Sequence, residues 1–296
     1  MRVAAIDLGT NSTRLLVAEI DLQAGRSEEL VRRTVVTGLG EGVDERRRLL
    51  PLPIARVRNA LTDFRRELEA LGAERTLAVA TSAVRDAENG EAFLGEIEWS
   101  YGFATRLLSG HEEAELTLAG VGALAPGTLL LDVGGGSTEL TAGSFRTSLD
   151  IGSVRLTERF LHGDPPTPAE LNAASDAICS LLPSLDVSDA IGVAGTVGQL
   201  AVLAGSDDLS ADDVDRLTRE LAALPLSDLR QIRGLVPERA PVIVAGALIV
   251  REALRRYGLG RIRFSVRDLL DGVALAAAAL PEPDEGAAPP GAYTCC

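Results

Sequence analysis

A short segment of the sequence occurs twice, and this repeat limits the folds open to the chain more than any other feature. The copies are AAIDLGTNSTRLL (4–16) and LLLDVGGGSTELT (129–141), which share an aspartate, a glycine, a serine, a threonine and a leucine in register. Each copy is an apolar run ending in an aspartate, then small residues, then a second apolar run. This pattern predicts a strand, a tight turn and a second strand. Its repetition predicts two similar domains.

The turn in each copy combines small residues with a carboxylate. Backbone N–H groups in such turns form concave sites for phosphate oxygens, whereas a carboxylate repels phosphate. A divalent metal removes the conflict, because Mg²⁺ is held by one or two carboxylates together with substrate phosphate. Asp132 is therefore the first candidate metal ligand and Asp7 the second. A single turn of this kind is typical of an ordinary hairpin, and the matched pair is what favours a phosphate clamp.

Strand and helix patterns alternate along the rest of the chain, which indicates an α/β fold with mixed sheets flanked by helices. A capping-box pattern begins a helix at Thr167. The predicted helices are 51–71, 167–182, 210–224, 227–235, 240–257 and 267–280, and the predicted strands outside the repeat include 76–81, 191–196 and 261–266. The predicted domains are 1–121 and 122–280, with the last helix able to pack back on the first domain. Residues 281–296 are low in complexity and predict a disordered tail.

Charge, hydropathy and residue spacing argue against several classes of function. The formal net charge of −14 argues against general nucleic-acid binding, which needs a basic surface. No window approaches the ~18 apolar residues of a membrane span. The N-terminus turns polar too early for a signal peptide, so a cytoplasmic location is the default expectation. Three cysteines (Cys179, Cys295 and Cys296) and two histidines (His111 and His162) show no metal-ligand spacing.

Six blocks occur in a fixed order, and together they carry a resemblance: IDLGTNSTRLLVAE, ATSAVRDAENGEAF, LSGHEEAELTLAGV, LDVGGGSTEL, GSVRLTERFL and GVAGT. The series resembles the exopolyphosphatase / guanosine pentaphosphate phosphohydrolase (Ppx/GppA) family, in its short two-domain form. The resemblance extends to about residue 280. It implies membership of the actin, sugar-kinase and heat-shock-chaperone superfamily, with two facing actin-like (ribonuclease H-like) domains and an active site in the cleft between them.

Two glutamates in the block LSGHEEAEL have different expected roles. Ser109 and Glu112 have the spacing of a capping box, so a helix cap is the favoured interpretation of Glu112. The family resemblance assigns the positioning and activation of the attacking water to Glu113. Without that resemblance, Glu113 would be read as a solvated carboxylate that complements the helix dipole.

The resemblance also assigns an arginine. Arg85, which follows a predicted strand and a Ser/Thr turn, matches the arginine that lines the phosphate site in the family. A guanidinium can bind a phosphoryl group bidentately and stabilise its developing charge. The alternative is a surface ion pair with Asp86 or Glu88.

The remaining site residues come from the two repeated turns and from GVAGT (192–196), which resembles the third phosphate-side turn of the superfamily. Expected phosphate contacts are Gly9, Thr10, Asn11, Ser12, Gly134, Gly135, Gly136, Ser137, Gly195 and Thr196. Glu139 either joins the outer shell of the metal or is an ordinary strand carboxylate paired with an arginine. Mg²⁺ is the expected cofactor, with Mn²⁺ as a substitute. Two departures from the family pattern put the second domain's substrate contacts in doubt: GTVGQLA replaces GTVTTLA, and Val266-Arg267 replaces a Glu-His pair.

The leading functional hypothesis is an Mg²⁺-dependent exopolyphosphatase, which removes terminal phosphate from inorganic polyphosphate. The same catalytic residues (Glu113, Arg85 and Asp132) would serve guanosine pentaphosphate hydrolysis. A kinase of the superfamily and a non-catalytic module that binds polyphosphate or the alarmone are further alternatives. A homodimer is a possible assembly. Arginines concentrated near the end of the chain either line a basic channel for polyphosphate or are ordinary surface residues: Arg251, Arg255, Arg256, Arg261, Arg263 and Arg267.

Overall fold

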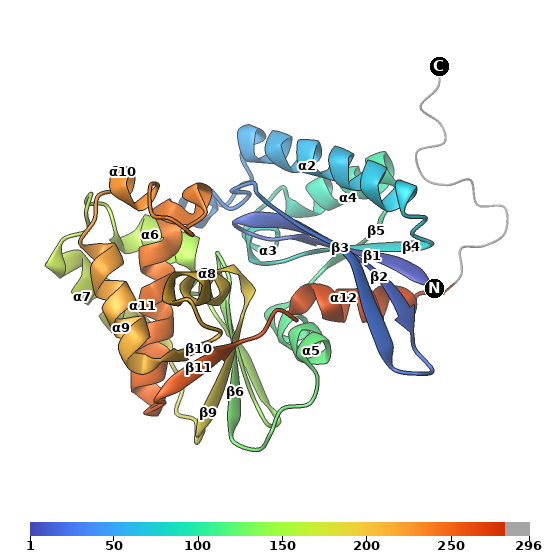
Figure 1. The fold of residues 1–296 in the computed structure, drawn as a ribbon. Coiled ribbons are helices and arrows are strands. Elements are labelled where there is room, and N and C mark those ends of the chain that lie inside the picture. Colours follow the sequence, from blue (N-terminus) through green and yellow to red (C-terminus); the bar gives the residue numbers. More distant parts are fainter. Residues whose placement is uncertain (282–296) are drawn as a thin grey trace. The chain divides into compact units, whose positions relative to one another are not determined.

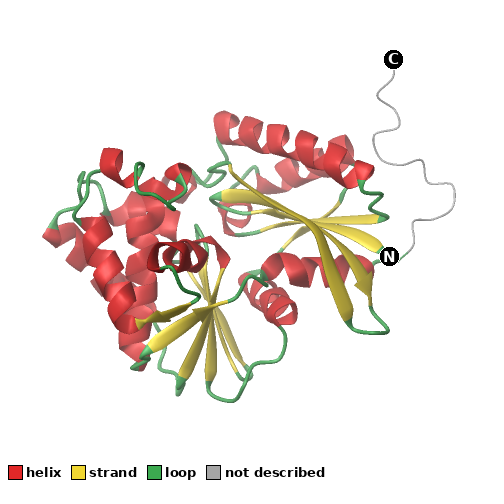
Figure 2. Cartoon of the chain, viewed as in Figure 1, coloured by secondary structure: helices red, strands yellow, loops and turns green. Residues whose placement is uncertain are grey.

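The computed structural model describes residues 1–281, which form two compact units. The first unit comprises Met1–Val121 and the residues from Leu269 onward, and the second comprises Gly122–Asp268. The last helix thus belongs to the first unit. Each unit contains one mixed sheet with helices beside it (Figures 1 and 2). Residues 282–296 of the predicted tail, with Cys295 and Cys296, lie outside the described residues.

The first unit is built on a five-stranded sheet with the order β3-β2-β1-β4-β5. Its strands are β1 (Arg2–Leu8), β2 (Ser12–Asp21), β3 (Arg26–Val36), β4 (Arg75–Ala80) and β5 (Ala104–Leu107), and its helices are α1 (Val43–Arg46), α2 (Pro51–Ala70), α3 (Ser82–Asp86), α4 (Gly90–Tyr101), α5 (Gly110–Val121) and α12 (Leu269–Ala278).

The central strand β1 is buried on both faces because helices cover the sheet on both sides. Ala4, Ile6 and Leu8 join the core under α2 and α4, whereas Val3 and Ala5 join a second core formed with α12. Figure 1 shows the two helical layers on opposite sides of this sheet. The alternation follows from the two-residue period of a strand. It also explains why β1 reads as a continuous apolar run.

The second unit is built on a six-stranded sheet with the order β10-β11-β9-β6-β7-β8. Its strands are β6 (Thr128–Val133), β7 (Thr138–Ala142), β8 (Phe145–Leu149), β9 (Asp189–Val193), β10 (Asp208–Ser210) and β11 (Arg261–Phe264). Its helices are α6 (Ser153–Phe160), α7 (Pro168–Leu181), α8 (Ala194–Ala204), α9 (Ala211–Ala222), α10 (Leu226–Leu229), the 3₁₀ turn η1 (Pro237–Arg239) and α11 (Ala240–Tyr257).

The sequence repeat is also a structural repeat. Strands β1 and β2 form an antiparallel hairpin, and so do β6 and β7. In each turn a glycine N–H donates to the serine carbonyl three residues later, at 3.1 Å for Gly9 and 3.0 Å for Gly134. In each sheet a parallel strand also lies beside the first strand of the hairpin, β4 beside β1 and β9 beside β6. The predicted hairpins and the mixed α/β class are therefore confirmed.

Other sequence predictions were less accurate. The predicted helix at 227–235 is wrong beyond its first turn, because α10 ends at Leu229. The predicted helix at 240–257 is confirmed as α11. Strand β3 and helix α4 were not predicted. The capping box at Thr167 and Glu170 is confirmed.

Candidate functional site

The candidate residues of the first unit lie where three parallel strands end. Strand β4 runs parallel to both β1 and β5, so the loops that follow these strands leave the same edge of the sheet. The loop after β1 carries the first glycine turn, the loop after β4 leads to Arg85, and the loop after β5 leads to Glu113. This carboxyl edge is where ligands bind in open α/β sheets.

The first glycine turn has its carbonyl groups tied to the following loop. The Thr10 carbonyl accepts a hydrogen bond from Gly40 N–H at 2.8 Å, and the Asn11 carbonyl accepts from the N–H groups of Thr37 and Gly38 at 3.0 and 2.9 Å. Within residues 1–281 the N–H groups of Thr10 and Asn11 have no acceptor, and the buried side-chain amide nitrogen of Asn11 has none either. The turn thus keeps donors for an anion.

The second glycine turn achieves the same arrangement with a helix. The Gly134 carbonyl accepts from Ser153 N–H at 2.9 Å, and the Gly135 carbonyl accepts from the N–H groups of Val154 and Arg155 at 2.8 and 3.1 Å. The first turn of α6 therefore holds the carbonyl side of the loop. In the described part of the chain the N–H groups of Gly135 and Gly136 donate to no protein group. Two unrelated anchors leave both turns with donors available.

The carboxylates of the two turns differ in their partners. Asp7 lies opposite Arg14 in the hairpin register, and its Oδ2 accepts from Arg14 Nε and Nη2, each at 2.9 Å. Asp132 lies opposite Glu139 instead, and both residues are buried. Glu139 Oε1 accepts from Ser148 Oγ at 2.7 Å. Asp7 is thus paired with the arginine opposite it, and Asp132 shares its register position with a second carboxylate, Glu139.

Asp132 and Glu139 are two buried carboxylates on neighbouring strands of the second unit. Buried like charges on neighbouring strands repel one another, and a divalent cation between them relieves the repulsion. Among residues 1–281 no group of three or more His, Cys, Asp or Glu side chains is suited to hold a metal. Mg²⁺ does not require such a cage, because it keeps several waters and takes its remaining ligands from substrate phosphate. Asp132 and Glu139, beside the second turn, fit that chemistry.

Glu112 caps helix α5, as its spacing predicted. Its Oε2 accepts from Ser109 N–H and Oγ, each at 2.8 Å, while Glu112 N–H donates to Ser109 Oγ at 3.3 Å. The hydrogen bond from the Ser109 backbone, with further bonds from the Ser109 hydroxyl and Arg106, lowers the pKa of Glu112 to about 2. This carboxylate is therefore already committed to the helix terminus.

Glu113, the next residue, points into the unit and lies beside Arg85. The residue is 7% exposed, and its Oε2 is 3.6 Å from Arg85 Nη1. The same Nη1 donates to the Leu108 carbonyl at 2.7 Å. Arg85 is thus held by groups of α5 and the preceding loop, rather than by Asp86 or Glu88. The structure brings together the two residues that the resemblance assigned to catalysis.

A third turn follows strand β9 in the second unit. Because β9 is parallel to β6, with Val193 opposite Asp132, this turn starts at the same sheet edge as the second glycine turn. Gly195 and Thr196 lie in the first turn of α8, and Thr196 is buried against Gly246 of α11. Ala194 has φ 63°, a left-handed conformation that is strained for a residue with a Cβ. Strain of this kind is concentrated at functional turns.

Comparison with known proteins decides the family. The Ppx/GppA phosphatase family model matches residues 16–279. The chain belongs to the Ppx/GppA phosphatase family.

Close relatives match this family member along nearly their whole length. Exopolyphosphatase 2 of Mycobacterium tuberculosis is 37% identical over 318 residues, which cover 94% of this chain and 98% of that protein. A crystal structure of an exopolyphosphatase-like protein matches with a TM-score of 0.86 and 30% identity, over 93% of this chain and 98% of that one. The Aquifex aeolicus PPX-GPPA enzyme matches with a TM-score of 0.77 and 29% identity, over 93% and 99%. These matches confirm the fold that the resemblance implied.

No helix in residues 1–281 is long and apolar enough to cross a membrane.

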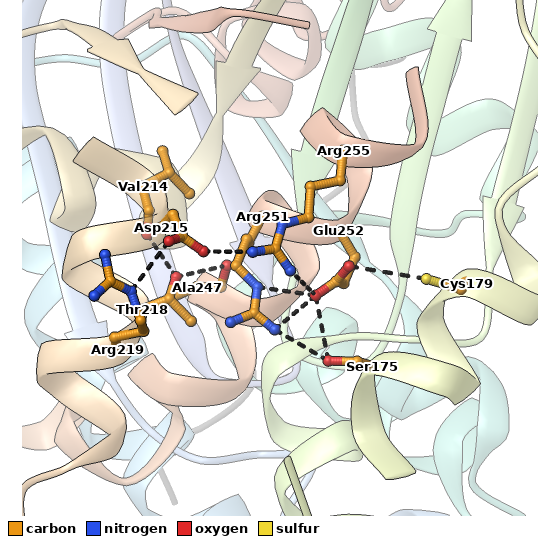
Figure 3. A network of polar contacts seen from close by, with 10 residues as sticks. All are labelled: Ser175, Cys179, Val214, Asp215, Thr218, Arg219, Ala247, Arg251, Glu252 and Arg255. Carbon is orange, nitrogen blue, oxygen red and sulfur yellow. Dashed lines mark hydrogen bonds and ion pairs between the residues drawn. The ribbon is translucent and has the colours of Figure 1, made fainter. Parts of the chain in front are cut away.

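The arginines near the end of this Ppx/GppA chain are largely engaged with carboxylates. Arg251 donates to the buried Glu252 and to Ser175, and Arg255 pairs with Asp215 and Glu252, as Figure 3 shows. Arg261 and Arg263 pair with Asp208 and Asp189. Four of the six arginines considered for a basic channel thus already have acidic partners, which favours their interpretation as ordinary helix-face and strand-edge residues.

Cys179 lies at the edge of the same network and is not an activated thiol. Burial, together with the charge of the Glu252 carboxylate, raises the pKa of the Cys179 thiol. A nucleophilic cysteine requires the opposite shift, because the thiolate is the reactive form. The structure therefore supports no catalytic role for Cys179.

Proposed function

We propose that this protein is an exopolyphosphatase, which hydrolyses the terminal phosphoanhydride of inorganic polyphosphate and releases orthophosphate. The observation that carries the proposal is the buried Glu113, which lies 3.6 Å from Arg85 at the carboxyl edge of the first sheet. Family membership and the 37% identity to an exopolyphosphatase support the choice of reaction.

The glycine turns would bind the phosphate chain. Each turn has two carbonyl groups anchored and two N–H groups without an acceptor among residues 1–281, so it can donate to phosphate oxygens with little rearrangement. The Asn11 side-chain amide adds a further buried donor. Because backbone donors carry no net charge, they can bind phosphate inside a protein whose formal charge is −14. These groups would position the chain, and positioning accounts for much of the catalysis of phosphoryl transfer.

Glu113 would orient the attacking water and accept its proton. In-line attack on a phosphoryl group needs an oriented nucleophile and stabilised charge, and general-base assistance contributes typically about 10²–10⁴-fold. Arg85 would supply the positive charge, since a guanidinium binds phosphoryl oxygens strongly. The two side chains lie 3.6 Å apart, close enough to act on the same phosphoryl group. Glu112 cannot substitute, because its carboxylate holds the N-terminus of α5.

Asp132, with Glu139 beside it, would hold the magnesium ion. When bound, Mg²⁺ would neutralise phosphate charge and so permit a carboxylate and a phosphate to share the second turn. Asp7 is the weaker candidate ligand because Arg14 already compensates its charge.

One assay separates the candidate functions. The purified protein is given polyphosphate, guanosine pentaphosphate or ATP with Mg²⁺, and released phosphate is measured. We expect release from polyphosphate that ceases when Mg²⁺ is chelated. Release from guanosine pentaphosphate alone would reassign the substrate within the same reaction class. Polyphosphate binding without release from any substrate would contradict the enzyme proposal and favour a binding module.

A further inference from the structure

Three consecutive arginines at the end of α1 present their side chains to solvent. Arg46, Arg47 and Arg48 are all exposed, and within residues 1–281 none of their guanidinium groups forms an ion pair or a hydrogen bond with another side chain or a carbonyl group. Other exposed arginines of the first unit have acidic partners, as Arg33 and Arg58 have at 2.6 Å. The basic cluster, residues 46–48, therefore keeps its charge available in a protein whose formal charge is −14.

The acidic residues that precede the basic cluster do not neutralise it. Glu41 pairs with Arg56 at 2.6 Å. In the described part of the chain no ion pair joins Asp44 or Glu45 to an arginine of the cluster. An anion that binds here therefore displaces no carboxylate.

Backbone and side-chain hydrogen bonds fix the loop that carries the cluster. Arg47 N–H donates to the Val43 carbonyl at 2.8 Å, and the Arg47 carbonyl accepts from Glu88 N–H at 2.8 Å. Asn89 holds the next turn of the loop, because its Oδ1 accepts from Leu49 N–H at 2.8 Å and its Nδ2 donates to the Leu49 carbonyl at 3.1 Å. Arg47 has φ 54°, a left-handed conformation that persists only where the surroundings impose it.

The loop leaves the first sheet at the same edge as the candidate catalytic residues. Strand β3 is antiparallel to β2, and β2 is antiparallel to β1, so β3 ends at the edge where β1 ends. Earlier in the loop, Gly40 N–H donates to the Thr10 carbonyl of the first glycine turn at 2.8 Å. Glu88, which is bonded to Arg47, follows Arg85 by three residues, so the backbones of Arg47 and Arg85 lie within about 20 Å of each other.

We propose that the basic cluster, Arg46 to Arg48, is a subsite for the distal phosphates of a long polyphosphate chain. The terminal phosphate of that chain would lie at Arg85 and Glu113. This inference rests on the proposed function and deepens it, because it makes long-chain polyphosphate the substrate that gains most from the site.

The chemistry of a polyanion favours this assignment. A long polyphosphate carries more charge than one glycine turn can accommodate, and a protein with a large negative charge repels it unless cations are gathered locally. Guanidinium groups bind phosphate oxygens through paired N–H donors. Binding also releases the counterions of the polyanion, which adds a favourable, salt-dependent contribution. The arginines near the end of the chain that have carboxylate partners lack this freedom.

The test compares a long and a short substrate in two matched variants. The double variant Arg46→Gln/Arg48→Gln removes two charges from the cluster and leaves Arg47, whose backbone fixes the loop. The control Arg26→Gln/Arg66→Gln removes the same charge from side chains of the first unit that are 82% and 76% exposed. Arg26 begins β3, so it lies at the opposite edge of the sheet from the cluster. Phosphate release from long-chain polyphosphate and from tripolyphosphate gives KM and kcat, and calorimetric titration gives Kd.

The cluster variant should lose affinity for the long chain alone. Its KM and Kd for long-chain polyphosphate should rise by about 3- to 30-fold, the loss expected for two exposed ion pairs. Its KM for tripolyphosphate and its kcat on both substrates should change by less than about twofold, because the groups at the reaction centre are unchanged. The difference from wild type should shrink at high salt. The control variant should change neither substrate's KM by more than about twofold.

The outcomes separate this inference from the proposed function. Thermal unfolding is measured for each variant, and Arg48→Gln alone replaces the double variant if the latter does not fold. Hydrolysis by the wild type with cluster and control variants indistinguishable on the long chain would overturn the inference and leave the proposed function intact. Equal losses on long-chain polyphosphate and tripolyphosphate would overturn the distal position of the subsite. Cluster-dependent binding of the long chain without hydrolysis would sustain the inference and overturn the proposed function. A wild type that neither binds nor hydrolyses polyphosphate would overturn both.

Discussion

Replacing Gly152 by alanine should disable the second glycine turn without substituting any residue that is proposed to contact substrate. Gly152 precedes α6 and packs against the loop 134–136 from its carbonyl side. Its backbone is extended, with φ −149° and ψ 168°, so alanine is tolerated conformationally at this position. The perturbation is therefore one of space alone.

The expected displacement can be read from the contacts. A Cβ on Gly152 would lie 2.4 Å from Gly135 C and O and 2.6 Å from Gly136 C, whereas ordinary contact begins near 3.4 Å. These neighbours are backbone atoms, so the loop itself must move, by about 1 Å. A misplacement of about 1 Å can cost about 10²-fold in rate. Overpacking of this kind should also cost about 1–3 kcal/mol of stability.

The assay compares phosphate release from polyphosphate by wild type, Gly152→Ala and the control Gly260→Ala. Gly260 lies in the same unit, and a Cβ there meets nothing within 4 Å. We expect a fall in kcat of about 10²-fold for Gly152→Ala at a temperature where it remains folded, and no comparable fall for Gly260→Ala. Full turnover by a folded Gly152→Ala variant would refute the claim that the loop must be held in this position.

Three further predictions follow from individual residues. Ala194→Gly should raise the free energy of unfolding, measured in urea, by about 0.5–1 kcal/mol, because it relieves the strain of an alanine in the left-handed conformation at a modest entropic cost. A lower free energy of unfolding would show that position 194 is not strained. Glu112→Gln should lower stability by about 0.5–1 kcal/mol at neutral pH, a figure reduced for solvent screening of this partly exposed group. The pKa of Glu112 is lowered from 4.5 to about 2, so the stability difference between wild type and Glu112→Gln should be complete above pH 4.5 and should shrink as the pH falls toward 2. Urea titrations in which this stability difference is unchanged at low pH would refute the prediction. Asp132→Asn should raise the Mg²⁺ concentration for half-maximal activity by at least about tenfold. Asp7→Asn should raise it by less, because Arg14 compensates the charge of Asp7. Equal effects of the two variants in a Mg²⁺ titration would argue against Asp132 as the main metal ligand.

Sequence reasoning succeeded where local pattern determines structure. The two hairpins were predictable because an aspartate, a glycine and a serine recur in register between apolar runs. The capping boxes at Thr167 and at Ser109 were predictable because the pairing partners are three residues apart. The same spacing predicted the cap at Glu112, whereas the role expected of Glu113 came from the family resemblance and not from the local pattern.

Sequence reasoning failed where the decisive contact is distant in the chain. The segment 227–235 has an apolar pattern typical of a helix, yet Gln199 draws Gly234 and Val236 into a loop. Arg255 suggested a channel partly because one of its two acidic partners, Asp215, lies on another helix, α9. The departure from the family pattern at Gln199 gains a structural explanation from the same loop, because the Gln199 side-chain amide bonds to it with both its nitrogen and its oxygen.

The central claim is that Glu113 activates the water that attacks polyphosphate, and its neighbour supplies the control. Phosphate release from polyphosphate is measured for wild type, Glu113→Gln and Glu112→Gln, with Mg²⁺ and at a temperature where all three are folded. Glu113→Gln should lose about 10²–10⁴-fold in kcat, the range for general-base catalysis, whereas Glu112→Gln should retain turnover because its carboxylate serves only as a helix cap. Full turnover by Glu113→Gln, or an equal loss in both variants, would contradict the account.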